Sequence, residues 1–419
     1  MDTKGCSNLT AEPDSRISAF DPANRVPRCV YLEGRIAGWD LHSLYREITD
    51  CPPEGYRFLV PKGSFIKQSR FYPINRGIVS FSGTKSLYDY VRPKAYYFAL
   101  SALSRKKIEA DLVYASQHVV NCSQPWVVDL EHAGALAAYG RTELIRAMVE
   151  KAFRSPWCGK IVPWTQMAKK SLEASFDCRG LQDKIEVVNL AIRPKNFKKE
   201  HHDRDIRIIF VGTANQSNIP DSFDIKGGRE MLEVFRILKK TYRNLELVIR
   251  SYVPDWARDV CARLNGVRLI DDLITPEELS NEFKSADIFV FPGHSTPGMV
   301  ILEAMSYELP VVATDVWANR ELVDDGRTGF LIKGSSKVRY FDENFIPLWG
   351  EPKFMRTIRQ VDSRVVEELV EKISLLIEDK ELRWQMGSVG RKEIENGRFS
   401  TMARNKRLKK IFDEAIESG

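Results

Sequence analysis

The loop 292–298 and the carboxylate of Glu303 are features of this chain that could bind a phosphorylated ligand. A continuous apolar run, Ile288–Phe291, ends at Pro292, and Met299–Ser306 then has apolar residues at helical spacing. The amino end of this helix would direct its free backbone amides at the loop, which suits a phosphate group. Glu303 falls within the first turns of the helix, where its carboxylate could bind ribose hydroxyls.

Short apolar runs predict the strands that must position this site. The apolar run Leu309–Ala313 follows the helical stretch and predicts a strand. Earlier in the chain, Thr275 followed by Pro276 and Glu278 is a signal for the start of a helix. Strands that alternate with helices indicate an α/β fold with parallel sheets covered on both faces, whose ligands sit at the carboxyl ends of the strands. Further strands are predicted at Cys29–Leu32, Tyr56–Val60, Gly77–Phe81, Asp111–Ala115, Trp126–Leu130, Lys160–Trp164, Lys184–Leu190, Ile206–Val211, Leu245–Ile249 and Val267–Ile270.

Length and composition limit the class of protein. A chain of 419 residues is too long for one ordinary core, so two domains are expected. The composition, 43% hydrophobic and 29% charged, is typical of a soluble globular protein. No apolar run approaches the roughly 20 residues that span a bilayer, and the first residues lack the pattern of a signal peptide. Seven cysteines without metal-like spacing indicate reduced thiols in a cytoplasmic protein.

Several motifs in the second half of the chain stand in the order and spacing of a known family. They are Phe291-Pro292, Gly298, Leu302-Glu303-Ala304-Met305, Leu309-Pro310-Val311-Val312-Ala313-Thr314, Glu321 and Gly329-Phe330-Leu331. With these motifs the chain resembles the retaining glycosyltransferases of group 1, or family 4, which have the GT-B fold. The resemblance implies two Rossmann-like domains that face each other across a cleft.

The resemblance also suggests how the chain is divided. Residues 1–25 are expected to be a loose lead-in, and residues 26–195 an acceptor domain that the C-terminal helix, about 398–419, completes. Residues 196–397 are expected to bind the nucleotide sugar. Within them, 337–359 is an aromatic, proline-bearing insertion whose purpose the sequence does not reveal.

In that family two glutamates separated by seven residues mark the donor site. Glu303 takes the place of the second, which binds the nucleotide ribose. The place of the first, which touches the transferred sugar, falls on Ser295, or on Thr296 if the loop is one residue short. This departure leaves the expected fold intact and weakens any inference about which sugar is held.

The family also neutralises the donor diphosphate with an arginine and a lysine. At the matching places this chain has Gly212-Thr213 and Lys226-Gly227, so the lysine is kept and the arginine is missing. Arg229 is a weaker substitute, because a residue further along the helix would point away. Loss of one bidentate phosphate contact should weaken donor binding by about 1.5–3 kcal/mol.

Residues at other strand ends complete the implied site. His132 follows the strand 126–130, in the place of a family histidine that contacts the donor sugar or its phosphate. Gly34 and Gly38 lie in a strand-to-helix turn that would lie against the diphosphate and the acceptor, although glycines commonly serve only to make such a turn. The remaining donor-binding candidates are Arg250, His294, Gly298, Met299 and Val300.

The segment 61–110 has a lopsided charge. It carries ten Lys or Arg against Asp89 and Glu109, with Tyr and Phe interleaved. Three interpretations stay open: nucleic-acid binding, which no fold motif supports; contact with an anionic membrane surface; and a solvated basic face beside core aromatics. Of the functional interpretations membrane contact is favoured, since many family members act on lipid-linked acceptors, and it would place the protein at the inner face of the membrane.

The resemblance, together with these observations, implies a metal-independent, retaining glycosyltransferase without a cofactor. It would move a sugar from a nucleotide-diphosphate sugar to a saccharide or lipid-linked acceptor, in the biosynthesis of a polysaccharide or glycolipid. His132, Lys226 and Ser295 would take part in catalysis. The alternative is a catalytically weak or inactive protein of the same fold that binds sugar nucleotide or assists a partner enzyme.

Overall fold

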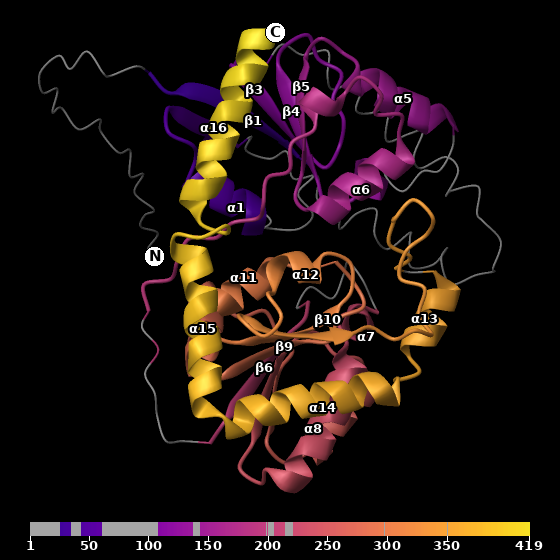
Figure 1. The fold of residues 1–419 in the computed structure, drawn as a ribbon, viewed down its shortest axis with the longest axis vertical. Coiled ribbons are helices and arrows are strands. Elements are labelled where there is room, and N and C mark those ends of the chain that lie inside the picture. The colour runs from indigo at the N-terminus through magenta and orange to yellow at the C-terminus, as the bar shows by residue number, and fades with distance from the viewer. Residues whose placement is uncertain are drawn as a thin grey trace, which may run out of the picture.

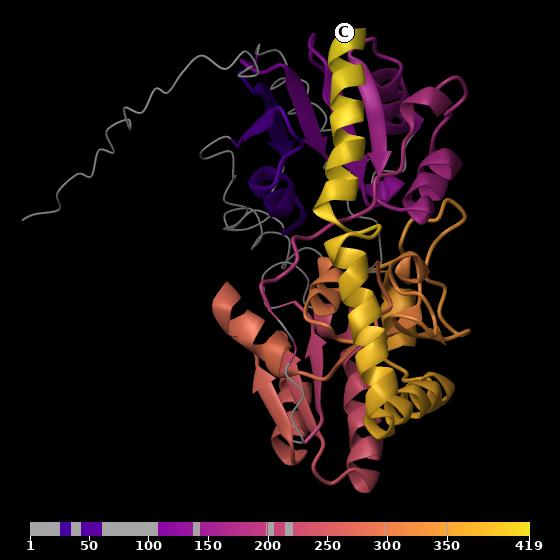
Figure 2. The same ribbon diagram turned by 60° about the vertical axis from the view of Figure 1, so that its left-hand side comes forward.

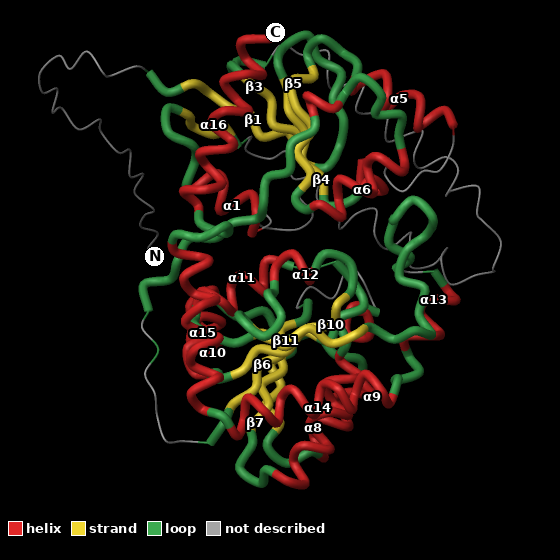
Figure 3. Tube along the Cα trace, viewed as in Figure 1, coloured by secondary structure: helices red, strands yellow, loops and turns green. Residues whose placement is uncertain are grey.

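The structure is a computed structural model that describes residues 26–34, 43–60, 108–136, 143–197, 199, 205–213, 221–296, 298–349 and 351–419. In these ranges the chain forms two parallel β-sheets, one in each half of the elongated molecule, and helices surround both (Figures 1 and 3). The predicted α/β architecture with two Rossmann-like units is confirmed.

The first unit is built on a sheet with the strand order β2-β1-β3-β4-β5, and every neighbouring pair is parallel. Its strands are β1 (Arg28–Gly34), β2 (Tyr56–Leu59), β3 (Leu112–Ser116), β4 (Trp126–Leu130) and β5 (Cys158–Pro163). Its helices are α1 (Ser43–Asp50), α4 (Ala133–Leu136), α5 (Glu143–Phe153), α6 (Gln166–Ser175) and the short 3-10 helix η2 (Gln182–Lys184).

The second unit has a sheet with the order β11-β10-β9-β6-β7-β8, again parallel throughout. Its strands are β6 (Arg207–Val211), β7 (Glu246–Arg250), β8 (Val267–Ile270), β9 (Ile288–Phe291), β10 (Val311–Asp315) and β11 (Gly329–Lys333). The helices of the second half are α7 (Ser222–Ile225), α8 (Gly228–Thr241), α9 (Asp255–Arg263), α10 (Pro276–Ser285), α11 (Met299–Ser306), α12 (Asn319–Leu322), α13 (Pro352–Ile358), α14 (Ser363–Glu378), α15 (Lys380–Glu395) and α16 (Thr401–Ser418).

Local sequence explains the elements next to the site. All four residues of β9 are buried, because the sheet is covered by α8, α9 and α14 on one face and by α10 and α11 on the other. The predicted start of α10 is confirmed: the Thr275 hydroxyl accepts a hydrogen bond from the Glu278 amide at 3.1 Å, and the Glu278 carboxylate accepts one from the Thr275 amide at 2.7 Å. These reciprocal bonds form a capping box.

Helix α16 returns from the second unit to the first sheet (Figure 2). Its Phe412 makes edge contacts with the rings of Tyr56, Phe58 and Tyr114. Glycine is required opposite the helix, since a Cβ atom at residue 159 would lie 2.4 Å from the Cβ of Ala415. The helix is therefore closely packed against β5.

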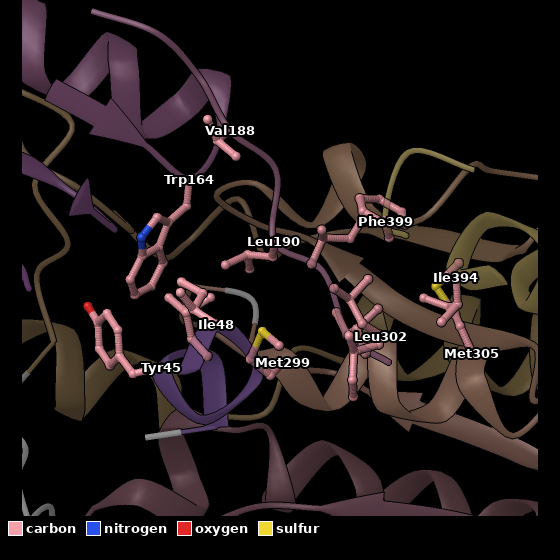
Figure 4. Close-up of a cluster of buried hydrophobic side chains, with 14 of the residues drawn as sticks. Tyr45, Ile48, Trp164, Val188, Leu190, Met299, Leu302, Met305, Ile394 and Phe399 are labelled. Atoms are coloured by element: carbon pink, nitrogen blue, oxygen red, sulfur yellow. The ribbon is translucent and has the colours of Figure 1, made fainter. Parts of the chain in front are cut away.

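One hydrophobic cluster joins the two units beside the site (Figure 4). Tyr45 and Trp164 enter it from the first unit, and Met299 and Leu302 of α11 enter it from the second. The site between the units thus has a continuous packed core on one side.

Some sequence-based expectations differ from the structure or lie outside it. Lys184–Leu190 is not a strand: η2 ends at Lys184, and only Ile185 then makes an isolated bridge, to Ile161 of β5. The predicted strand 77–81, the glycine Gly38 and the basic segment from 61 to 107 lie outside the described residues.

Candidate functional site

A cavity of about 220 Å³ lies between the two units at the carboxyl ends of their strands. Both units contribute to its wall. The described residues that line it are Glu131, Trp164, Leu190, Thr213, Ser222, Ile225, Lys226, Ser295, Thr296, Gly298, Met299 and Trp349. Six of the predicted site residues are therefore brought together: Thr213, Lys226, Ser295, Thr296, Gly298 and Met299.

Two loops of the second unit are tied together at the base of this cavity. The backbone amide of His294 donates to the carbonyl of Ile225 at 2.8 Å, so the loop after β9 lies beside the turn between α7 and α8. At that turn Gly227 has a φ of +83°, and a Cβ atom there would lie 2.2 Å from the carbonyl oxygen of Pro292. Only glycine allows this close approach, which sets the position of the neighbouring Lys226.

Lys226 provides the positive charge of the cavity. Its Nζ donates to the Ser295 hydroxyl at 3.1 Å and lies 5.3 Å from the centre of the Phe291 ring. Burial lowers the pKa of Lys226, and the negative charge of Glu131 partly offsets this effect. An ammonium group held at the amino end of α8 is well placed for a phosphate group.

Glu303 lies one helical turn beyond the cavity-lining Met299 on α11. Burial raises the pKa of Glu303, whereas the positive charges of Lys195 and Arg250 act in the opposite direction. Arg250 stands at the end of β7, and burial lowers its pKa while Glu303 raises it. The structure thus brings Glu303, the predicted ribose-binding residue, close enough to the donor-binding candidate Arg250 for their charges to interact.

His132 is buried behind the cavity wall. Its ring makes edge contacts with Trp317, at a centroid distance of 6.2 Å, and with Trp349, at 5.8 Å. Burial lowers the pKa of His132 to about 4, so the imidazole is neutral near pH 7. It adjoins the cavity-lining Glu131 and Trp349 without lining the cavity itself.

Other predicted residues lie off the cavity wall. His294 turns its ring to Glu230, with 3.1 Å between Nε2 and Oε1, and stacks on Tyr340. Gly34 ends β1 in register with Ser116 of β3. Val300 and Arg250 are not among the described residues that line the cavity, so their contacts with the donor stay predictions.

Arg229 does not replace the missing arginine of the family pattern. Its Nε donates to Asp224 at 2.8 Å, and its guanidinium lies 3.9 Å above the ring of Trp256. These contacts direct it away from the cavity, which leaves Thr213 at the place where the second phosphate-binding charge was expected.

Glu131 was not predicted from the sequence. It directly follows β4 and points into the cavity from the first unit, opposite Lys226. Burial raises the pKa of Glu131, while a hydrogen bond with the Thr296 side chain and the charge of Lys226 lower it. Its place at the carboxyl end of a buried parallel strand is the signal that could have identified it.

The insertion 337–359 supplies another unpredicted wall. Trp349 lines the cavity and packs against His132 of the first unit. The centre of the Phe345 ring lies 4.2 Å from the Nζ atom of Lys170, also of the first unit. Val338, Leu348 and the α13 residues Phe354, Met355 and Ile358 share a hydrophobic cluster with Ile225. The insertion therefore links the Lys226 turn to the first unit.

Two further features of the described ranges concern metals and membranes. Within those ranges no three His, Cys, Asp or Glu side chains gather as metal ligands would. Among the helices that the structure describes, none has the length and hydrophobicity that crossing a bilayer requires.

Comparison with known proteins finds a family match within the second unit. Residues 205–346 match the family model described as glycosyl transferases group 1. The capsular polysaccharide biosynthesis glycosyltransferase CapM of Staphylococcus aureus is 29% identical over 200 residues, which cover 46% of this chain and 44% of that protein. The chain thus spans less than half the length of this relative.

Solved structures extend the likeness to both units. A glycosyltransferase of Rickettsia africae superposes with a TM-score of 0.57 at 12% identity, over 94% of this chain and 99% of that chain. HepE of Anabaena, solved in complex with UDP, has a TM-score of 0.57 at 15% identity, over 92% of this chain and 99% of that chain. At this identity the likeness shows the fold, which is the GT-B fold of glycosyltransferases.

Proposed function

We propose that this chain, whose second unit matches the group 1 glycosyl transferases, is a retaining glycosyltransferase of family 4. It moves a sugar from a nucleoside-diphosphate sugar to a saccharide or lipid-linked acceptor. The observation that carries the proposal is the position of Lys226. Its side chain is hydrogen-bonded to Ser295 in the wall of a cavity between two Rossmann-like units. The named activity of CapM and the UDP complex of HepE support the same class of reaction and donor.

The cavity residues suggest how the reaction proceeds. The departing diphosphate gains negative charge as the glycosidic bond breaks, and Lys226 together with the amino ends of α8 and α11 stabilises it. The acceptor hydroxyl attacks from the face that the diphosphate leaves and gives its proton to the departing diphosphate, so the anomeric configuration is retained. In this proposal the lysine provides the charge that a metal ion supplies in other transferases.

The two units take different parts in this proposal. Residues 196–397 hold the donor, and residues 26–195 with the C-terminal helix hold the acceptor. The basic and aromatic segment 61–110 supports peripheral contact of this cytoplasmic enzyme with the inner face of the membrane.

A panel of nucleotide sugars tests the proposal. Purified protein is incubated with UDP-glucose, UDP-N-acetylglucosamine, GDP-mannose and related donors, and free nucleotide is measured over time. Slow hydrolysis of one donor supports the transferase. Binding without any turnover, with or without acceptor saccharides, would instead favour the alternative of a protein that assists a partner enzyme.

Changing Glu303 to glutamine is expected to weaken donor binding and turnover at least about tenfold, because a neutral amide accepts more weakly from the ribose hydroxyls. The thermal midpoint should stay nearly unchanged, as the residue is only partly buried. Titration calorimetry and a melting curve measure both quantities. Glu277→Gln, at an exposed position on α10, is the matched control. An equal loss of stability in Glu303→Gln would mark a structural carboxylate.

Changing Trp349 to alanine is expected to weaken binding of the intact donor, the nucleotide sugar that the wild-type protein hydrolyses in this panel, by about three- to tenfold. The reason is that one aromatic side chain is removed from the cavity wall. Trp256→Ala serves as control, because Trp256 is 36% exposed and lies against Arg229, away from the cavity. Donor titrations of both variants measure the effect. Equal affinities in the two variants would show that the insertion does not shape the donor site.

A further inference from the structure

We infer that Glu131 binds a hydroxyl group of the transferred sugar and so helps to select the donor. The inference rests on the proposed function, because it assigns a role within the same cavity. Glu131 and Lys226 are the acidic and the basic side chain among the described residues that line this cavity. They come from opposite units, Glu131 from the first and Lys226 from the second.

The two charges of the cavity favour one orientation of a bound nucleotide sugar, with the diphosphate near Lys226 and the sugar near Glu131. A diphosphate is attracted to Lys226 and repelled by a carboxylate, so it lies on the side of the second unit. The part of the donor that faces Glu131 must then offer hydrogen-bond donors. Sugar hydroxyls do so, and a carboxylate can accept such bonds from two of them.

Neighbouring groups hold the Glu131 carboxylate in place within the cavity wall. Burial raises the pKa of Glu131, and a hydrogen bond with the Thr296 side chain and the nearby charge of Lys226 act against that rise. The residue also follows directly after β4, all of whose residues are buried, so its backbone is fixed by the sheet. Trp164 and Trp349 line the same cavity and offer flat apolar surfaces to the C–H faces of a sugar ring.

The test compares a nucleotide sugar with its own nucleoside diphosphate. The probe is whichever of UDP-glucose, UDP-N-acetylglucosamine or GDP-mannose the wild-type protein binds most tightly, and UDP or GDP is the reference. In Glu131→Gln the affinity for the nucleotide sugar should fall at least about tenfold, whereas the affinity for the diphosphate should change less than about twofold. Glu143→Gln, at an exposed position on α5 of the same unit, should change neither affinity.

The outcomes separate this inference from the proposed function. If the wild type binds a nucleotide sugar and Glu131→Gln loses affinity for sugar and diphosphate alike, or for neither, the role in sugar selection is overturned. A fall in transfer rate with unchanged donor affinity would also overturn it and assign Glu131 to the acceptor. If Glu131→Gln fails to fold, Glu131→Asp keeps the charge, withdraws the carboxylate by one methylene and should show the same selective loss. If the wild type binds no nucleotide sugar, the proposed function fails and the inference falls with it.

Discussion

Replacing Lys226 by alanine is expected to weaken binding of the donor's nucleoside diphosphate about 100-fold, while binding of the bare nucleoside changes less than about twofold. The effect should be selective because, in the proposed function, the ammonium binds the phosphate groups and not the base or the ribose. It is also large, because Lys226 is the basic side chain among the described residues that line the cavity. Thr213 stands where the family pattern has an arginine, and Arg229 is engaged by Asp224.

Titration calorimetry with UDP and uridine, or with GDP and guanosine, measures the two affinities. Lys240→Ala is the matched control, since Lys240 lies exposed near the other end of the same helix α8. Equal losses for the diphosphate and the nucleoside would show that Lys226 acts on the shape of the site and not on phosphate. Turnover should fall further than ground-state binding, because charge on the diphosphate grows as the glycosidic bond breaks.

The strand-helix-strand segment β9-α11-β10 of the second unit could be predicted, because the sequence signals for each element are local. The apolar run of β9, the helical spacing of α11 and the apolar β10 each arise within a few residues, and the structure has all three. Lys226 could also be placed, since a family pattern marks the start of α8, and it does line the cavity.

Contacts across long sequence separations could not be predicted. The carboxylate of Glu321 accepts hydrogen bonds from the backbone amides of Gln166 at 2.6 Å and Met167 at 2.9 Å, so a residue of the second unit caps α6 of the first. The motif showed Glu321, but nothing near it in the chain shows a partner about 155 positions away. Trp349 reaches the cavity for the same reason: the packing of the insertion between the two units brings it there.

The side-chain direction of His294 was equally hidden. Its loop lies at the cavity, as predicted, and the neighbouring Ser295 lines it. The ring itself is buried against Glu230 and Tyr340, because α8 offers a buried carboxylate on that side. A loop's position follows from the strand pattern, whereas the orientation of one side chain depends on what packs behind it.

The second prediction concerns Asp129 and the pH dependence of the free energy of unfolding. Its fully buried carboxylate accepts hydrogen bonds from the Tyr45 hydroxyl at 3.1 Å, the Tyr114 hydroxyl at 3.1 Å, the indole N–H of Trp164 at 3.0 Å and the Gln117 amide at 3.0 Å. These four donors favour the ionised form, yet burial dominates and raises the pKa of Asp129 from 3.8 to about 6. Since Trp164 also lines the cavity, this network supports one wall of the site.

The folded state therefore holds the Asp129 proton more tightly than the unfolded chain does. Its contribution to stability is fully present below pH 3.8 and is lost as the pH rises through about 6. A shift of about two pKa units corresponds to about 3 kcal/mol. Asp129→Asn stays neutral, so the free energy of unfolding of the wild type, relative to this variant, should fall by about 2.5 kcal/mol between pH 4 and pH 7.5. Urea denaturation followed by tryptophan fluorescence at several pH values measures this difference. Asp183→Asn, at an exposed position, should show no such trend. A constant difference between wild type and Asp129→Asn across that range would show that the four hydrogen bonds outweigh burial.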